Sequence, residues 1–106
     1  MKQLGQSAVG TGAGTTLYTV PTGFQTNMMD IVITNTTSSS ISFSIHIVPS
    51  GDSASTSNSM FYQVPLSGNT TVQWTGTQHM SAGKFIKAIG SASGITMTIS
   101  GEESRA

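Results

Sequence analysis

The stretch SISFSIHIV at residues 40–48 decides the fold, because apolar and polar side chains alternate along it. Its odd-numbered residues are isoleucine or phenylalanine, whereas the even-numbered residues from 40 to 46 are serine or histidine. A period of two is that of a β-strand with one buried face. We therefore predict a strand here, with its odd-numbered side chains in the core.

The same alternation recurs at residues 27–35 and 95–100, and turn-forming residues separate the apolar segments. Four weaker strand candidates lie at residues 16–20, 60–66, 70–75 and 84–89. No segment combines helical periodicity with a capping residue at its start. The chain is therefore predicted to be all-β, an antiparallel β-sandwich or jelly roll of about seven or eight strands.

The ends of the chain differ in composition from the predicted strands. Residues 1–14 are rich in Gly, Ser, Gln and Thr, and Leu4 and Val9 are scattered apolar side chains among them. Such a segment does not bury enough surface to offset its ordering entropy. We predict a flexible N-terminal arm at residues 1–14, with Leu4 and Val9 contacting a partner. The sandwich is predicted at residues 15–101, followed by a C-terminal tail at residues 102–106.

One strand pairing can be predicted from the alternation. The strands at residues 27–35 and 40–48 both place their core residues at odd positions, so an antiparallel pair between them needs an even sum of partner numbers. A sum of 76 leaves a short loop and sets Ile31 opposite Ile45. On the other face it sets Asp30 opposite His46, which is the acid–histidine pair that the pattern brings together.

Asp30 and His46 allow two interpretations. They could be an orienting acid and a base, with a serine as nucleophile. They could instead be a polar cross-strand pair, which contributes about 0.2–1 kcal/mol. No Gly-x-Ser-x-Gly elbow accompanies them, so the structural pair is the preferred interpretation and no catalytic residue is assigned.

The remaining histidine and carboxylates give no metal site. His79 could join His46 and a carboxylate around a metal, but no pair of ligands has the required spacing, and His79 is expected in a loop. Asp30 and Asp52 could imitate a glycosidase pair, although Asp52 follows Pro-Ser-Gly and is expected to stabilise a turn. We predict no metal and no cofactor.

Three aromatic residues offer a different kind of site. Trp74, Tyr18 and Tyr62 could together form a platform on which sugars stack. Aromatic residues make up only 7% of the chain, so packing in the core or at its rim is the preferred interpretation.

Charge is scarce: 8% of residues are charged and the formal net charge is zero, while 17 residues are serine and 16 threonine. Without a basic patch, binding to nucleic acid or to an anionic membrane is not expected. Neither a signal peptide nor a membrane-spanning run is recognisable, so a cytosolic product is expected. Uncharged polar strand faces favour association with other subunits.

Four stretches carry a resemblance to a known group of proteins. They read LYTVPTG at residues 17–23, DIVITNT at 30–36, IHIVPSG at 45–51 and ITMTISG at 95–101. In this order they resemble small β-sandwich virion proteins encoded by tailed bacteriophages, and they span the whole predicted sandwich.

The resemblance implies a non-enzymatic structural protein present in repeated copies on the virion. We expect a capsid decoration (cement) protein, a homotrimer that binds the major capsid protein lattice after assembly in the host cytoplasm. The alternatives are a tail, baseplate or fibre component, including a receptor- or glycan-binding tip, and a separate carbohydrate-binding module. An enzyme is the least favoured class.

Overall fold

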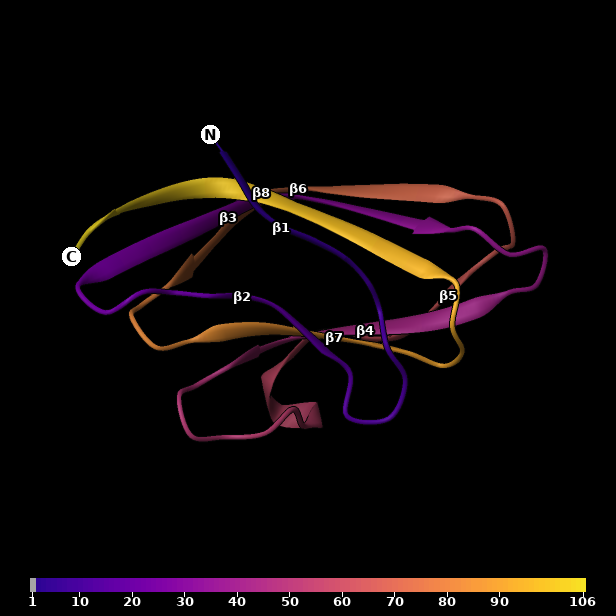
Figure 1. The fold of residues 1–106 in the computed structure, drawn as a ribbon, viewed down its shortest axis with the longest axis horizontal. Coiled ribbons are helices and arrows are strands. Elements are labelled where there is room, and N and C mark those ends of the chain that lie inside the picture. The colour runs from indigo at the N-terminus through magenta and orange to yellow at the C-terminus, as the bar shows by residue number, and fades with distance from the viewer. Residues whose placement is uncertain (1) are drawn as a thin grey trace.

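The computed structural model describes residues 2–106, which form two antiparallel β-sheets packed face to face (Figure 1). The strands are β1 (Lys2–Ala8), β2 (Thr15–Thr19), β3 (Phe24–Asn35), β4 (Ile41–Val48), β5 (Ser59–Leu66), β6 (Thr71–Met80), β7 (Phe85–Gly90) and β8 (Ile95–Arg105). The first sheet has the order β1-β8-β3-β6 and the second the order β2-β7-β4-β5. One 3-10 turn, η1 (Thr56–Asn58), precedes β5.

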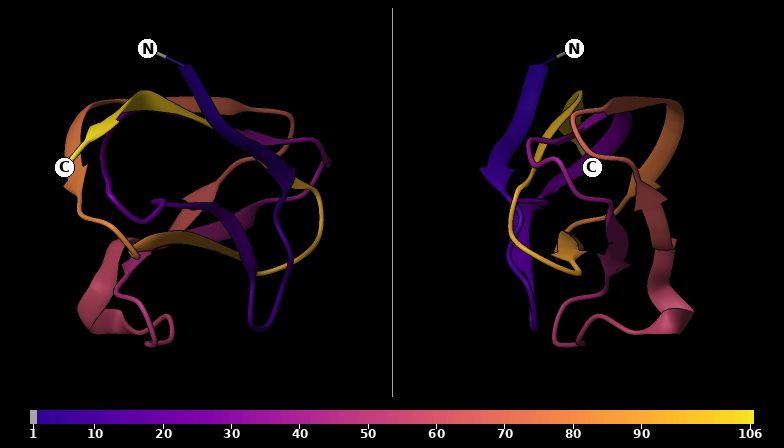
Figure 2. Two further views of the ribbon diagram at one scale, coloured as in Figure 1. Left: turned by 60° about the vertical axis from the view of Figure 1, so that its left-hand side comes forward. Right: turned by 90° about the vertical axis from the view of Figure 1, so that its right-hand side faces the viewer.

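The strand pairs are nested as in a jelly roll. β1 pairs with β8, β2 with β7, β3 with β6 and β4 with β5, so the chain resembles one long hairpin wound into a sandwich. β1 and β2 lie along one side of the molecule, and β6 and β5 form the edges on the opposite side (Figure 2). The predicted all-β jelly-roll sandwich is confirmed.

All seven strands predicted from alternation are present, and the core lies between the sheets. The apolar side chains that pack together there are almost fully excluded from water: Val9, Leu17, Val20, Met28, Ile31, Ile33, Ile41, Phe43, Ile45, Leu66, Met80, Ile86, Ala88, Ile95, Met97 and Ile99. Burial of this apolar surface is the main favourable term in folding.

The predicted boundary of the N-terminal arm is wrong, because residues 2–8 form β1 at the edge of the first sheet. Leu4 packs against the core, and Val9 is only 3% exposed. The N–H of Val9 donates to the carbonyl oxygen of Ile95 at 2.8 Å. An edge strand needs few core residues because its backbone pairs with a neighbouring strand, so two apolar side chains are enough here.

The predicted C-terminal tail is also wrong in its boundary. β8 continues to Arg105, which lies opposite Phe24 in β3. The Arg105 guanidinium lies 5.5 Å from the centroid of the Phe24 ring, a cation–π distance. Backbone pairing with the long strand β3 orders this segment despite its polar sequence.

The chain crosses from the first sheet to the second at residues 36–40, and Asn35 organises the crossing. Its side chain is fully buried. The amide donates to the carbonyl oxygens of Ser39 at 2.8 Å and Leu66 at 3.0 Å. Its Oδ1 accepts hydrogen bonds from the backbone N–H and the hydroxyl of Thr37. This side chain therefore ties the crossing to the end of β5.

Candidate functional site

The predicted pairing of Asp30 with His46 is wrong, because β3 and β4 lie in different sheets. Asp30 lies between Thr75 and Ser100 on the outer face of the first sheet. Its carboxylate accepts a hydrogen bond from the amide of Gln73 at 2.7 Å. Two strands that both point their odd-numbered residues inward can face each other across a core as well as pair side by side. The chain adopts the first arrangement.

His46 anchors a loop on the outer face of the second sheet. The residue is 3% exposed, and its Nδ1 lies 2.9 Å from the carbonyl oxygen of Ser55 and 3.0 Å from Oδ1 of Asn58. Both neighbours are hydrogen-bond acceptors, so Nδ1 carries the proton. Oδ1 of Asn58 also accepts the N–H of Ser55. The imidazole therefore holds η1 against the sheet.

His79 lies in β6, and its predicted position in a loop is wrong. Its Nδ1 lies 3.1 Å from Oδ1 of Asn27 on the neighbouring strand β3. Asp52 does lie in a turn, where its N–H donates to the carbonyl oxygen of Pro49 at 3.0 Å. Among residues 2–106, no three His, Cys, Asp or Glu side chains are grouped as metal ligands.

The three candidate aromatic residues do not form one platform. Trp74 lies edge-on to Phe61, with ring centroids 6.4 Å apart, on the side of the sandwich formed by β5 and β6. Tyr18 lies in β2, at the opposite edge of the second sheet, where its hydroxyl donates to the carboxylate of Glu103. Tyr62 is exposed. Trp74 and Tyr18 therefore serve different sides of the molecule.

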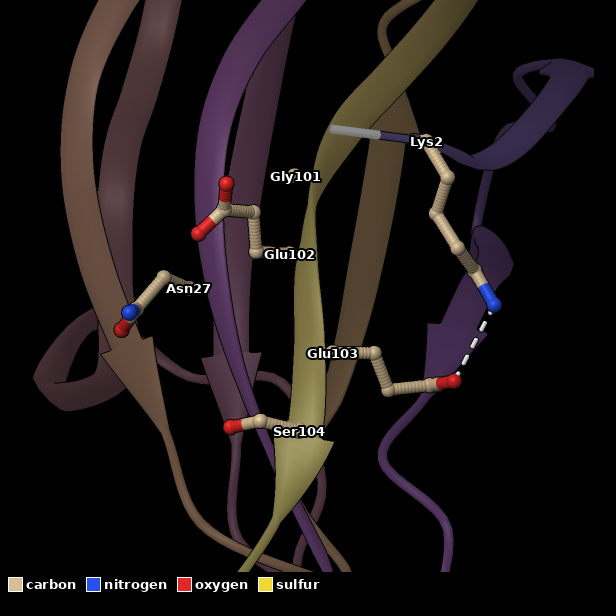
Figure 3. Close-up of a pocket in the computed structure, with 6 residues that line it drawn as sticks. All are labelled: Lys2, Asn27, Gly101, Glu102, Glu103 and Ser104. Atoms are coloured by element: carbon tan, nitrogen blue, oxygen red, sulfur yellow. Dashed lines mark hydrogen bonds and ion pairs between the residues drawn. The ribbon is translucent and has the colours of Figure 1, made fainter.

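A hollow of about 320 Å³ lies over β8 and β3 near the chain termini (Figure 3). Glu102 and Ser104 project to the same side of β8 as Asn27, whereas Glu103 points the other way toward Lys2 (Figure 3). Lys2 Nζ and Glu103 Oε1 form an ion pair at 3.1 Å. The hollow is open, and five of its six lining residues have polar or charged side chains, so it extends the polar surface of the first sheet.

A short polar network joins the two sheets beside this hollow. The hydroxyl of Tyr18 contacts Glu103 and also lies 2.8 Å from Oγ1 of Thr26. Hydrogen bonding from Tyr18, and secondly from Lys2, lowers the pKa of Glu103 below its ordinary value of 4.5. Burial, and secondly the bond to Glu103, raises the pKa of Tyr18 above 10.0. The network therefore favours an ionised Glu103 and a neutral Tyr18.

Acid is expected to remove the stability that Glu103 contributes. A carboxyl group whose pKa is lowered by folding stabilises the fold above its unfolded value of 4.5 and loses that effect as the pH falls through its folded pKa. The variant Glu103→Gln should therefore be less stable than the wild type at pH 7, and the difference should shrink at pH 3. Urea denaturation at several pH values measures this.

The matched control is Glu102→Gln, which removes the same charge from the adjacent residue but leaves the Tyr18 contact intact. A difference between wild type and Glu103→Gln that is equal at pH 3 and pH 7 would contradict the assigned role of Glu103.

The part of the outer face of the first sheet that is called the polar face below consists of three cross-strand rows on β6, β3 and β8. The rows are Thr71–Thr34–Thr96, Gln73–Val32–Thr98 and Thr75–Asp30–Ser100. None of these residues is buried, and Asp30 is the one charged member. The hydroxyls of Thr34 and Thr71 hydrogen-bond at 3.1 Å, and Gln6 of β1 donates to Thr98 at 3.2 Å. The polar face can exchange hydrogen bonds with a partner while exposing almost no charge.

The side of the sandwich between β5 and β6, called the open edge below, holds an apolar groove of about 240 Å³. The residues lining it come from both sheets: Ile33, Phe43, Phe61, Val64, Val72, Gln73 and Trp74. Among these residues, the only polar side-chain groups are the amide of Gln73 and the indole N–H of Trp74. The core residues Ile33 and Phe43 thus form the floor of a groove whose other lining residues are partly or largely exposed.

The open edge was not predicted from the sequence. One signal was present: Met60, Phe61 and Tyr62 are three consecutive large apolar or aromatic residues. A strand with one buried and one solvated face alternates instead. Such a run departs from the alternation of a strand that has one solvated face.

No protein-family model, curated protein or solved structure matches this chain. Within residues 2–106, no helix has the length and apolar character needed to cross a bilayer. The fold and surfaces define a jelly-roll sandwich with a polar face that carries one charge and an open apolar edge.

Proposed function

We propose that this chain is a non-enzymatic structural protein of a tailed-bacteriophage virion. In this proposal it decorates the head as a homotrimer bound to the major capsid protein lattice. The polar face is the observation that carries the proposal, and the resemblance of the four sequence stretches to phage virion proteins supports it.

The chemistry of the polar face suits a large and permanent protein contact. Burying a charge is costly unless it is paired, whereas hydroxyl and amide groups recover hydrogen bonds across an interface at modest cost. Thr98 and Ser100 on β8 lie opposite Val32 and Asp30 on β3. The polar face is therefore formed by adjacent strands rather than by a single loop. Asp30 is already bonded to Gln73, which reduces its demand for water.

The mechanism is stabilisation by mass action. A protein that binds the assembled lattice, and not the dissociated subunits, shifts the equilibrium toward the assembled state. At a free concentration 100 times the Kd, each bound site contributes about 2.7 kcal/mol. Many weak local contacts can thereby stabilise a whole shell.

Placing a cation in the polar face is expected to weaken binding of the chain to phage heads. The variant Thr98→Lys puts an ammonium group at the centre of the proposed contact, where burial without a partner costs several kcal/mol. Binding to purified undecorated heads should weaken by about tenfold or more. Co-sedimentation with heads over a concentration series measures it.

The matched control is Thr22→Lys, which adds the same charge in an exposed turn away from the polar face. Thermal unfolding of both variants verifies the fold. Equal head binding by Thr98→Lys and wild type would refute the polar face as the contact. A small number of copies located only at the tail would overturn head decoration in favour of a tail component.

A further inference from the structure

We infer that the open edge is the surface through which copies of this chain bind one another. The inference rests on the proposed function in one respect, since a virion protein present in repeated copies has other copies of itself as neighbours. Its evidence is otherwise the geometry of β5 and β6.

The sandwich is unevenly closed at its two sides. On one side β1 and β2 approach each other, and Tyr18 links the second sheet to Glu103 of the first. On the other side Phe61 reaches from β5 to the ring of Trp74 on β6, and the groove of about 240 Å³ remains beside them. The core side chains Ile33 and Phe43 line this groove. Covering it would remove apolar surface from water, which is favourable.

Of the two exposed large hydrophobic residues of the described chain, Val72 lines this groove and Tyr62 directly follows its lining residue Phe61 in β5. Tyr62 on β5 is 51% exposed and Val72 on β6 is 41% exposed. The indole of Trp74 extends over Gly76, where a Cβ would lie only 2.8 Å from its Cζ2. Clustered apolar exposure of this kind marks an interaction site, whereas scattered single residues do not.

The backbone of β6 also favours pairing. β6 is a ten-residue edge strand without proline or charge, and it pairs with β3 on one side only. The other edges are less suited to pairing. β5 contains Pro65 and two register shifts, β1 carries Lys2 and β2 has only five residues, whereas the uncharged ten-residue β6 has one register shift in its pairing with β3. A long, uncharged edge strand is a template for another strand.

Charge indicates what kind of partner fits. Neither β5 nor β6 contains Asp, Glu, Lys or Arg, so a charged partner would lose hydration there without gaining an ion pair. A second copy brings an equally uncharged edge, and the zero net charge of the chain adds no long-range repulsion. A small ligand fits less well, because the groove lacks the several convergent polar groups that orient one.

The test uses the purified full-length chain and the variant Val72→Lys. Val72 is substantially exposed, so the lysine stem can be accommodated in the monomer while its ammonium opposes burial of the edge. Light scattering coupled to size-exclusion chromatography gives the mass over a dilution series. Trp74, the only tryptophan, reports on the groove through its emission wavelength and its quenching by acrylamide.

We expect the wild type to form a homo-oligomer, with Trp74 becoming more accessible to quencher as dilution dissociates it. Val72→Lys should weaken this association by about tenfold or more. The control Thr19→Lys, on an exposed position of edge strand β2, should associate like the wild type. A monomeric wild type, or equal association of Val72→Lys and wild type, would overturn the inference.

Head binding is measured separately and decides only the proposed function. If the wild type associates through this edge but does not bind heads, the inference stands and the head-decoration proposal is overturned. If the wild type is monomeric but binds heads, the head-decoration proposal stands and the inference is overturned. This second result is also expected if an apolar segment of another virion protein, and not a second copy, occupies the open edge.

Discussion

The variant Asn35→Ala is expected to lower the free energy of unfolding by about 3 kcal/mol or more, a large fraction of the stability of a small domain. The side chain of Asn35 is fully buried and bonds to Ser39, Leu66 and Thr37. Removing it withdraws the buried amide donor of the Leu66 carbonyl, leaves the Ser39 carbonyl with the Thr37 hydroxyl as its donor, and opens a cavity at a fully buried position. A buried polar group without a partner costs about 1–3 kcal/mol, and the cavity adds to this cost. Urea denaturation at neutral pH measures the change.

Asn27→Ala is the matched control for this variant. It removes the same amide from β3, but Asn27 lies on the outer face, where its Oδ1 lies 3.1 Å from Nδ1 of His79 in an exposed contact. The control should cost about 1 kcal/mol or less, since solvent can replace the lost hydrogen bond. If the two variants were equally destabilised, Asn35 would not be organising the crossing between sheets.

The role of Asn35 also explains why the sheet assignment of β3 and β4 could not be predicted. The alternation of apolar and polar residues predicts which side chains enter the core, and this prediction is correct for Ile31 and Ile45. It does not predict whether two such strands pair within one sheet or face each other from two different sheets. That choice depends on the path of the crossing, which a buried side chain determines through contacts with the distant β5–β6 loop.

The candidate sites depend on the same missing information. The abundance of uncharged polar residues predicted association, and the polar face is a concrete location for it. The open edge was harder to predict, because a strand becomes an edge only through the topology of the whole sheet. β6 is an edge because β3 lies on one side of it and no strand within residues 2–106 lies on the other.

Deletion of residues 2–8 is expected to abolish cooperative folding of the chain. It removes β1, exposes the adjoining edge of β8 and withdraws Leu4 from the core. It also removes Gly5, which approaches β2 so closely that a Cβ would lie 2.2 Å from the carbonyl oxygen of Leu17. Circular dichroism during heating should show no sharp transition for the truncated chain.

A point variant tests the same strand without shortening the chain. Gly5→Val should force β1 away from β2 and lower the unfolding midpoint, whereas Gln3→Val on the exposed side of β1 should change stability by no more than about 0.5 kcal/mol. A flexible arm predicts the opposite outcome: truncation and both substitutions would leave the unfolding transition unchanged, and any loss would be confined to partner binding. These variants therefore separate a strand that completes the sandwich from an arm that serves only its partners.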